Sequence, residues 1–210
     1  MAEIIPAFPL SIVPFPGEEI NLHIFESRYK SLINECVDLN KSFCLLPIFE
    51  DKDKTYGTEM VVIDVAKRYK DGKLDIRTKG VNLMKIITVI DKLNGKLYPG
   101  VEYEKLYWDD VSDLYMNIEI VDLLEKLFSK LSVQNIKLKN PSDFRTYQVG
   151  HKVGFNIDQE LEFLALQKEV ERQRYMLAHL VKFLPIIDEM NSLKEKAKLN
   201  GYFKPLPPMF

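Results

Sequence analysis

Two short turn signals constrain the fold of this chain more than any other feature. Asp71-Gly72 and Asn94-Gly95 are dipeptides that favour two-residue hairpin turns, because their residues readily adopt the positive φ angles that such turns need. Both lie between short runs that are rich in β-branched residues, which predicts antiparallel hairpins and argues against a doubly wound parallel sheet. The strands expected on either side of the turns are residues 60–69, 74–79, 81–90 and 97–106.

The N-terminal segment 4–17 carries four prolines and no charge. Proline has no backbone N–H, so we expect an edge strand or an extended segment packed on the core. A helix is predicted over 27–39, with Ser27 as its N-cap, and a strand over 43–49. Residues 1–107 are therefore predicted to form a small closed or half-closed β-barrel of about six strands with one short helix.

The second half has helical periodicity, which makes the fold class α+β. Predicted features are a helix over 116–131, a helix start at 140–143, a helix from Asn156 with a capping box to Gln159, and a helix over 170–199. We expect Pro185 to kink or break the last helix and Gly201 to end it. Residues 108–204 then form a helical bundle, and residues 205–210 an extended tail.

Charge and cysteine content exclude several function classes. The chain has 29 basic and 31 acidic residues, a net charge of −2, shared evenly between its halves. This balance argues against sequence-independent binding to nucleic acid or to anionic lipid. Two cysteines, Cys36 and Cys44, are too few for a disulfide framework, and from the sequence we expect neither a membrane span nor a signal peptide. A cytoplasmic protein with reduced thiols is expected.

No pattern of catalytic residues is found. The sequence lacks a phosphate-binding glycine loop, a nucleophile elbow and a His-Glu-x-x-His pair, so we expect no catalytic residue, no cofactor and no metal ligand. The three histidines, His23, His151 and His179, are interpreted as packing or surface residues. The mixed-charge run 169–174 is interpreted as a solvated helix face.

One block of residues is not explained by composition. It comprises Phe8-Pro9-Leu10, Pro14-x-Pro16-Gly17 and Leu22-His23-Ile24-Phe25-Glu26-x-Arg28-Tyr29. This block resembles the N-terminal substrate-binding domain of the Lon protease family, and it is most similar to short bacterial proteins that consist of this domain. Weaker matches follow in order, at Tyr56-Gly57-Thr58, Asp71-Gly72, Gly80 with 83–86, and Leu97-Tyr98; Lys85 stands where the family usually has arginine.

The resemblance implies a PUA-like β-barrel followed by a helical bundle. In Lon, this region recruits unfolded or tagged proteins to an ATPase ring and a Ser-Lys peptidase, and we expect neither catalytic part in this chain. Glu26 is expected to cap backbone amides and Arg28 to pair with a loop carboxylate. The candidate binding residues are Phe8, Pro9, Leu10, Pro16, Gly17, His23, Phe25, Glu26, Arg28, Tyr29 and Tyr98.

The leading hypothesis is therefore a non-catalytic module that binds client or unfolded polypeptides, or docks on a protease or chaperone partner. Its expected surface is a groove between barrel and bundle, with residues 4–15 and 98–108 as walls. The alternative is an RNA-binding PUA-like module, which requires a local basic face. An enzyme would need a polar pocket with converging titratable groups. The sequence leaves the oligomeric state open.

Overall fold

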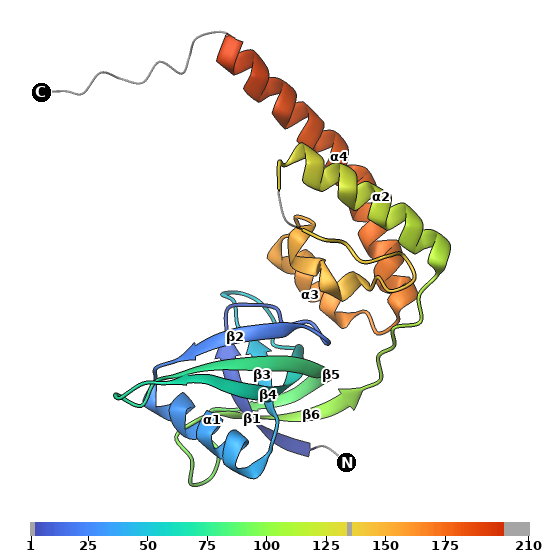
Figure 1. Cartoon of the computed structure of the whole chain (residues 1–210). Helices are drawn as coiled ribbons and strands as arrows, with labels where there is room; N and C mark the ends of the chain where they lie inside the picture. The colour runs from blue at the N-terminus through green and yellow to red at the C-terminus, as the bar shows by residue number, and fades with distance from the viewer. Residues whose placement is uncertain (1–2, 134–135, 200–210) are drawn as a thin grey trace, which may run out of the picture. The chain divides into compact units, whose positions relative to one another are not determined.

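The structure is a computed structural model that describes residues 3–133 and 136–199. Its contacts form two compact units (Figure 1). The first, here called the sheet unit, comprises the described residues up to Val111 together with Arg145–Arg172; the second, the helical unit, comprises Ser112–Phe144 and the residues from Gln173 onward. Residues 145–172 thus group with the sheet, whereas the sequence suggested one boundary at residue 107. The predicted stop at Gly201 and the tail 205–210 lie outside the described residues.

The sheet unit is built on a mixed sheet of six strands in the order β2-β5-β4-β3-β1-β6. Strand β5 also pairs with β6, so β5, β4, β3, β1 and β6 form a continuous circuit of paired strands. All neighbours are antiparallel except β1 and β3. The strands are β1 (Glu3–Leu10), β2 (Glu19–Ile24), β3 (Phe43–Pro47), β4 (Tyr56–Arg68), β5 (Leu74–Ile90) and β6 (Gly100–Leu106).

Strand β1 lies between β3 and β6, so the prediction of an edge strand is wrong. The structure nevertheless shows why its prolines are tolerated. Glu3–Pro6 pairs with β6, whereas Ala7–Leu10 pairs with β3. Each half of β1 therefore pairs with only one neighbouring strand. A proline is tolerated where its nitrogen, which has no N–H, faces the side without a paired strand.

Both predicted hairpins are present, but neither connection is a two-residue turn, because residues 69–73 separate β4 from β5 and residues 91–99 separate β5 from β6. The Asp71-Gly72 turn joins β4 to β5, and Gly72 has a φ of 81°. The Asn94-Gly95 turn lies between β5 and β6, and Gly95 has a φ of 72°. The runs 74–79 and 81–90 are one long strand rather than two, because β5 continues through Gly80.

Helix α1 (Ser27–Leu39) has the predicted bounds, but its N-cap residue is Glu26 instead of Ser27. The Glu26 side chain makes no capping hydrogen bond, so its predicted capping role is wrong as well. Four residues of α1 are buried against the sheet: Tyr29, Leu32, Ile33 and Cys36. With Phe8, Ile24, Phe43, Leu45, Met60 and Tyr98 they form the main core of the sheet unit.

The helices after residue 108 follow the predictions in part. The structure has α2 (Leu114–Lys130), α3 (Ile157–Ala165) and α4 (Glu169–Leu199), and α3 begins with the predicted capping box between Asn156 and Gln159. No helix starts at 140–143; a turn and two short 3-10 helices, η1 (Thr146–Gln148) and η2 (Gly150–Lys152), follow there. Helix α4 continues through Pro185, so the proline does not break it. Within the described residues, no helix is long and apolar enough to span a membrane.

Candidate functional site

Most of the predicted binding residues line two adjoining cavities at one corner of the sheet unit. The smaller cavity, about 200 Å³, lies between the end of β1, the end of β2 and the first turn of α1. The larger, about 480 Å³, shares four lining residues with it: Pro9, Leu10, Glu26 and Tyr29. We call the two cavities together the β1–α1 groove. The smaller one is lined by Phe8, Pro9, Leu10, Asn21, Leu22, His23, Ile24, Phe25, Glu26 and Tyr29.

The floor of this groove is aromatic and rigid. Phe8 contacts Tyr29 edge to face, with ring centroids 4.3 Å apart, and both residues are buried. Burial raises the pKa of the Tyr29 hydroxyl, so this group stays neutral. The Arg28 guanidinium lies 4.5 Å from the Tyr29 ring centroid, within the range of a cation–π contact. A fixed apolar floor with a charged margin is the usual construction of a binding cavity.

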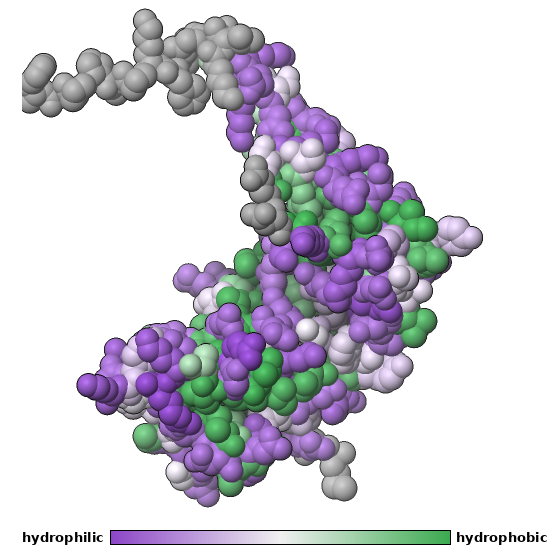
Figure 2. Space-filling model, in the orientation of Figure 1, coloured by the Kyte–Doolittle hydropathy of each residue, from purple (hydrophilic) through white to green (hydrophobic). Residues whose placement is uncertain are grey.

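Phe25 is the exposed aromatic residue at the margin of the groove. It lies between β2 and α1 and is 59% exposed. The sheet unit exposes other apolar side chains as well, among them Ile4, Ile63, Ile87 and Leu97, and Figure 2 shows hydrophobic and hydrophilic surface interspersed on the viewed face. Phe25, unlike these four, lines one of the two cavities of the groove. Its ring also stacks loosely on His23, with centroids 6.2 Å apart.

The polar margin of the groove consists of side chains that hydrogen-bond to one another. His23 Nδ1 lies 2.6 Å from Asp75 Oδ1, and the Tyr69 hydroxyl donates to Asp75 Oδ2 over 2.7 Å. These hydrogen bonds lower the pKa of the Asp75 carboxyl, which is therefore ionised at neutral pH. Arg28 Nε donates to Glu26 Oε2 over 2.9 Å. Arg28 therefore pairs with a carboxylate of the connection before α1, two residues away, and not across to another loop as predicted.

Three predicted residues lie elsewhere. Tyr98 is 1% exposed and donates its hydroxyl to Glu35, which also accepts from Lys96, so Tyr98 ties the loop before β6 to α1 instead of forming a groove wall. Pro16 and Gly17 belong to the turn before β2, where Gly17 has a φ of 83°. They line a separate polar pocket of about 340 Å³.

That separate pocket contains a histidine that the sequence interpretation treated as a packing residue. His151 lies 2.8 Å from Glu160 and 3.3 Å from Glu18, one carboxylate at each ring nitrogen, and its ring stacks on Phe15. Burial lowers the pKa of His151, but the hydrogen bonds and charges of Glu160 and Glu18 outweigh this effect and raise it to about 9. His151 is thus a cation at neutral pH, and it fastens the turn before β2 to η2 and α3.

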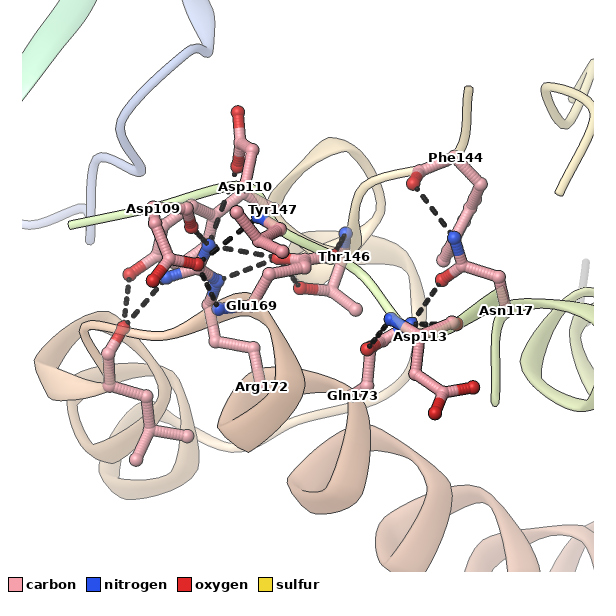
Figure 3. Close-up of polar contacts among 12 residues, drawn as sticks. Asp109, Asp110, Asp113, Asn117, Phe144, Thr146, Tyr147, Glu169, Arg172 and Gln173 are labelled. Carbon is pink, nitrogen blue, oxygen red and sulfur yellow. Dashed lines mark hydrogen bonds and ion pairs between the residues drawn. The ribbon is translucent and has the colours of Figure 1, made fainter. Parts of the chain in front are cut away.

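The run 169–174 was predicted as a solvated helix face, and this prediction is wrong. Glu169 and Arg172 have no exposed surface. Arg172 donates to Glu169 Oε2 and to the Leu166 carbonyl, each over 2.9 Å, and to the Asp109 carbonyl (Figure 3). Its guanidinium lies 4.1 Å from the ring centroid of Tyr147. The neighbouring Gln173 is also buried and belongs to a second network, in the helical unit.

The Gln173 network joins α2 to α4 inside the helical unit. The Gln173 side chain donates to the Asp113 carbonyl and to Asn117 Oδ1, and it accepts from the Asp113 N–H (Figure 3). Asn117 in turn donates to the carbonyls of Pro141 and Phe144. Both networks satisfy buried polar groups. Asp110 and Tyr147, which contact Arg172, also line the polar pocket of about 340 Å³ that contains His151.

Comparison with known proteins places the chain in a family. The sequence model of the ATP-dependent protease La (LON) substrate-binding domain matches residues 4–183. The chain belongs to the LON substrate-binding domain family. The predicted resemblance is thereby confirmed, and the family is a substrate-binding domain that is not itself catalytic.

Two solved structures share this fold, and one further protein shares part of the sequence. The Lon N-terminal domain protein from Xanthomonas campestris superposes with a TM-score of 0.65 at 23% identity, over 84% of this chain and 98% of that one. The N-terminal domain of the Mycobacterium avium complex Lon protease gives 0.64 at 15%, over 85% and 98%. A LON peptidase N-terminal domain and RING finger protein, C14F5.10c of Schizosaccharomyces pombe, is 29% identical over 122 residues; the match covers 49% of this chain and about a quarter (24%) of that protein.

Proposed function

We propose that this chain is a non-catalytic recognition module that captures exposed apolar segments of client polypeptides in the β1–α1 groove. The observation that supports this most is the pairing of an apolar cavity, large enough for one bulky side chain, with the exposed ring of Phe25 beside it. Client binding by the family's domain makes a polypeptide the natural ligand class.

The strand arrangement adds a source of affinity. Strand β2 lies at the edge of the sheet and pairs only with β5 among the described strands. Its residues Leu22–Ile24 line the smaller cavity. An extended client could therefore form backbone hydrogen bonds with the open edge of β2 while one of its side chains enters the cavity.

The circuit of paired strands supports the further proposal that the sheet unit is a PUA-like β-barrel. The helices of the other unit, joined through Gln173, are consistent with a small helical bundle. Cys36 and Cys44 are buried free thiols, and burial raises the pKa of the Cys36 thiol to about 12. Such inert thiols fit the cytoplasmic setting that we propose for this activity.

The test uses the full chain and a fluorescently labelled, reduced and carboxymethylated client, with binding followed by anisotropy. Phe25→Ala removes an apolar side chain that client binding would cover. At about 25 cal/mol per Å², burying roughly 60–80 Å² of ring surface corresponds to about 1.5–2 kcal/mol, which is a loss of affinity of about tenfold or more. Leu97→Ala is the matched control, because Leu97 is 63% exposed and lines neither cavity.

Two outcomes would contradict the proposal. The first is equal loss of affinity in Phe25→Ala and Leu97→Ala, because the groove would then have no special role. The second is absence of client binding together with salt-sensitive binding of a single-stranded RNA oligonucleotide, which would favour the RNA-binding alternative.

A further inference from the structure

Helix α4 carries two apolar stripes, and only one of them is covered by the residues that the structure describes. Within the helical unit, Met176, Leu180, Leu184 and Ile187 are buried. A second stripe consists of Phe183, Ile186, Met190, Leu193 and Ala197, and we call it the α4 seam. Ile186, Met190 and Leu193 are 51%, 47% and 58% exposed. Such exposure of three large side chains in a row is unusual on a helix that already has a buried face.

The spacing of the seam is that of a coiled coil. Its five residues are separated by three, four, three and four positions, which is the 3.5-residue repeat of alternating d and a positions in a heptad. With Phe183, Met190 and Ala197 at a, Ile186 and Leu193 occupy d. The pattern is independent of the buried stripe, which follows spacings of four, four and three.

Helix α2 leaves the seam uncovered. The two helices run side by side from Asp113, which bonds to Gln173, as far as Lys130. The Lys130 side chain pairs with Asp188, and its carbonyl accepts a hydrogen bond from the Asn191 side chain. Because α2 ends at Lys130, the α4 residues after Asn191 extend past its end. Leu193 lies on this extension.

We propose that the α4 seam binds the same seam of a second copy of this chain, as a short parallel two-stranded coiled coil. Charge selects this occupant and this orientation. In a parallel, in-register pair, the residue before an a position lies opposite the residue after the next d position of the partner helix. These positions hold Glu189 and Lys194. Two-fold symmetry would form this opposite-charge pair twice, once on each side of the seam.

The dimer has a direct test in solution. Sedimentation of the full chain over about a hundredfold range of concentration is expected to show monomers of 24.5 kDa in equilibrium with dimers of twice that mass. Ile186→Glu with Leu193→Glu is expected to leave only monomers. Val181→Glu is the matched control, because Val181 is 56% exposed but lies on the side of the helix away from the seam, and this variant is expected to dimerise like the wild type.

A charge exchange tests the orientation. Glu189→Lys alone and Lys194→Glu alone are each expected to weaken the dimer about three- to tenfold, since each places like charges opposite one another. The double exchange is expected to restore the wild-type dissociation constant. Far-UV circular dichroism of each variant checks that the helices remain folded.

Three results would overturn the proposal. They are a monomeric wild type at every concentration, a dimer that survives Ile186→Glu with Leu193→Glu, and a double charge exchange that is weaker than either single one. The last result would leave the dimer but refute its parallel register. Binding of a helix from a different protein by a wild type that does not self-associate would likewise refute the second copy as the occupant.

Discussion

Arg172→Met removes the cation from the fully buried ion pair of the sheet unit. Methionine keeps an unbranched chain of similar length but cannot donate a hydrogen bond. The substitution deprives Glu169 of its charge partner at 2.9 Å and deprives the carbonyls of Leu166 and Asp109 of their donor. Glu169 keeps two hydrogen bonds from Thr146, one from the backbone N–H at 2.8 Å and one from the hydroxyl at 3.0 Å.

The expected loss follows from burial. Burial raises the pKa of the Glu169 carboxyl even with Arg172 present, which shows that its surroundings solvate the charge poorly. Removing one partner of a buried pair costs about 3–5 kcal/mol, because an uncompensated charge stays behind. We therefore expect the free energy of unfolding of the sheet unit to fall by about 3–5 kcal/mol.

Trp108 gives a local readout of this loss. It is the only tryptophan of the chain, its ring centroid is 6.1 Å from that of Tyr147, and the Arg172 guanidinium lies 5.8 Å from its ring. Its fluorescence during urea unfolding reports the sheet unit, and circular dichroism recorded in parallel reports both units. Arg174→Met is the matched control; Arg174 is exposed, so we expect a change within about 0.5 kcal/mol.

A double variant separates the charge effect from the packing effect. Glu169→Gln combined with Arg172→Met removes both charges, and we expect it to be more stable than Arg172→Met alone by at least about 1 kcal/mol. A loss below about 1 kcal/mol in the single variant would refute the reasoning, and so would a double variant no more stable than the single one. In either case the buried pair would contribute through packing alone.

Two further predictions concern the His151 cluster. The pKa of His151 is raised to about 9 from 6.5, so its contribution to stability is complete below about pH 6.5, while its carboxylate partners remain ionised, and is lost as the pH rises through 9. Because the side chain is 35% exposed, we expect this contribution to be about 1–2 kcal/mol. It is measured as the difference in unfolding free energy between pH 6.5 and pH 10, which His151→Gln is expected to abolish. Gly150→Ala would place a Cβ 2.5 Å from the Phe15 ring, so we expect a destabilisation of about 1–3 kcal/mol in urea unfolding, and an unchanged midpoint would contradict this packing.

Local turn and cap chemistry made part of the fold predictable. Gly72 and Gly95 adopt positive φ angles that few other residues tolerate, which favours a chain reversal at each position. Asn156 and Gln159 specify the start of α3 through two reciprocal hydrogen bonds. The position of β1 was not predictable in this way. Whether a proline-containing strand is central depends on which half of it each partner uses, and this is a long-range property.

The candidate site was predictable to the extent that one sequence block builds it. Phe8 to Leu10 and His23 to Tyr29 are close in the fold because β1 and the β2–α1 corner line the same cavity. Tyr98 was misplaced among the binding residues, because its hydroxyl satisfies Glu35 inside the unit. A tyrosine in a motif can be there for a buried hydrogen bond as readily as for a ligand.

Residues 169–174 were misinterpreted because their charges were considered without their position on the helix. Glu169, Arg172, Met176 and Leu180 are spaced by three or four residues, so they share the helix face that carries the buried apolar stripe. The apolar residues of this stripe begin at Met176, but the same helix face extends back to Glu169. An opposite-charge pair at i and i+3 in line with an apolar stripe can be buried as one neutral unit, provided that a third element supplies hydrogen bonds. Here Thr146, from a segment that the sequence assigned to a helix, supplies them. The error at 140–143 and the error at 169–174 therefore have one cause: the polar partner that stabilises each local structure lies more than twenty residues away in the sequence.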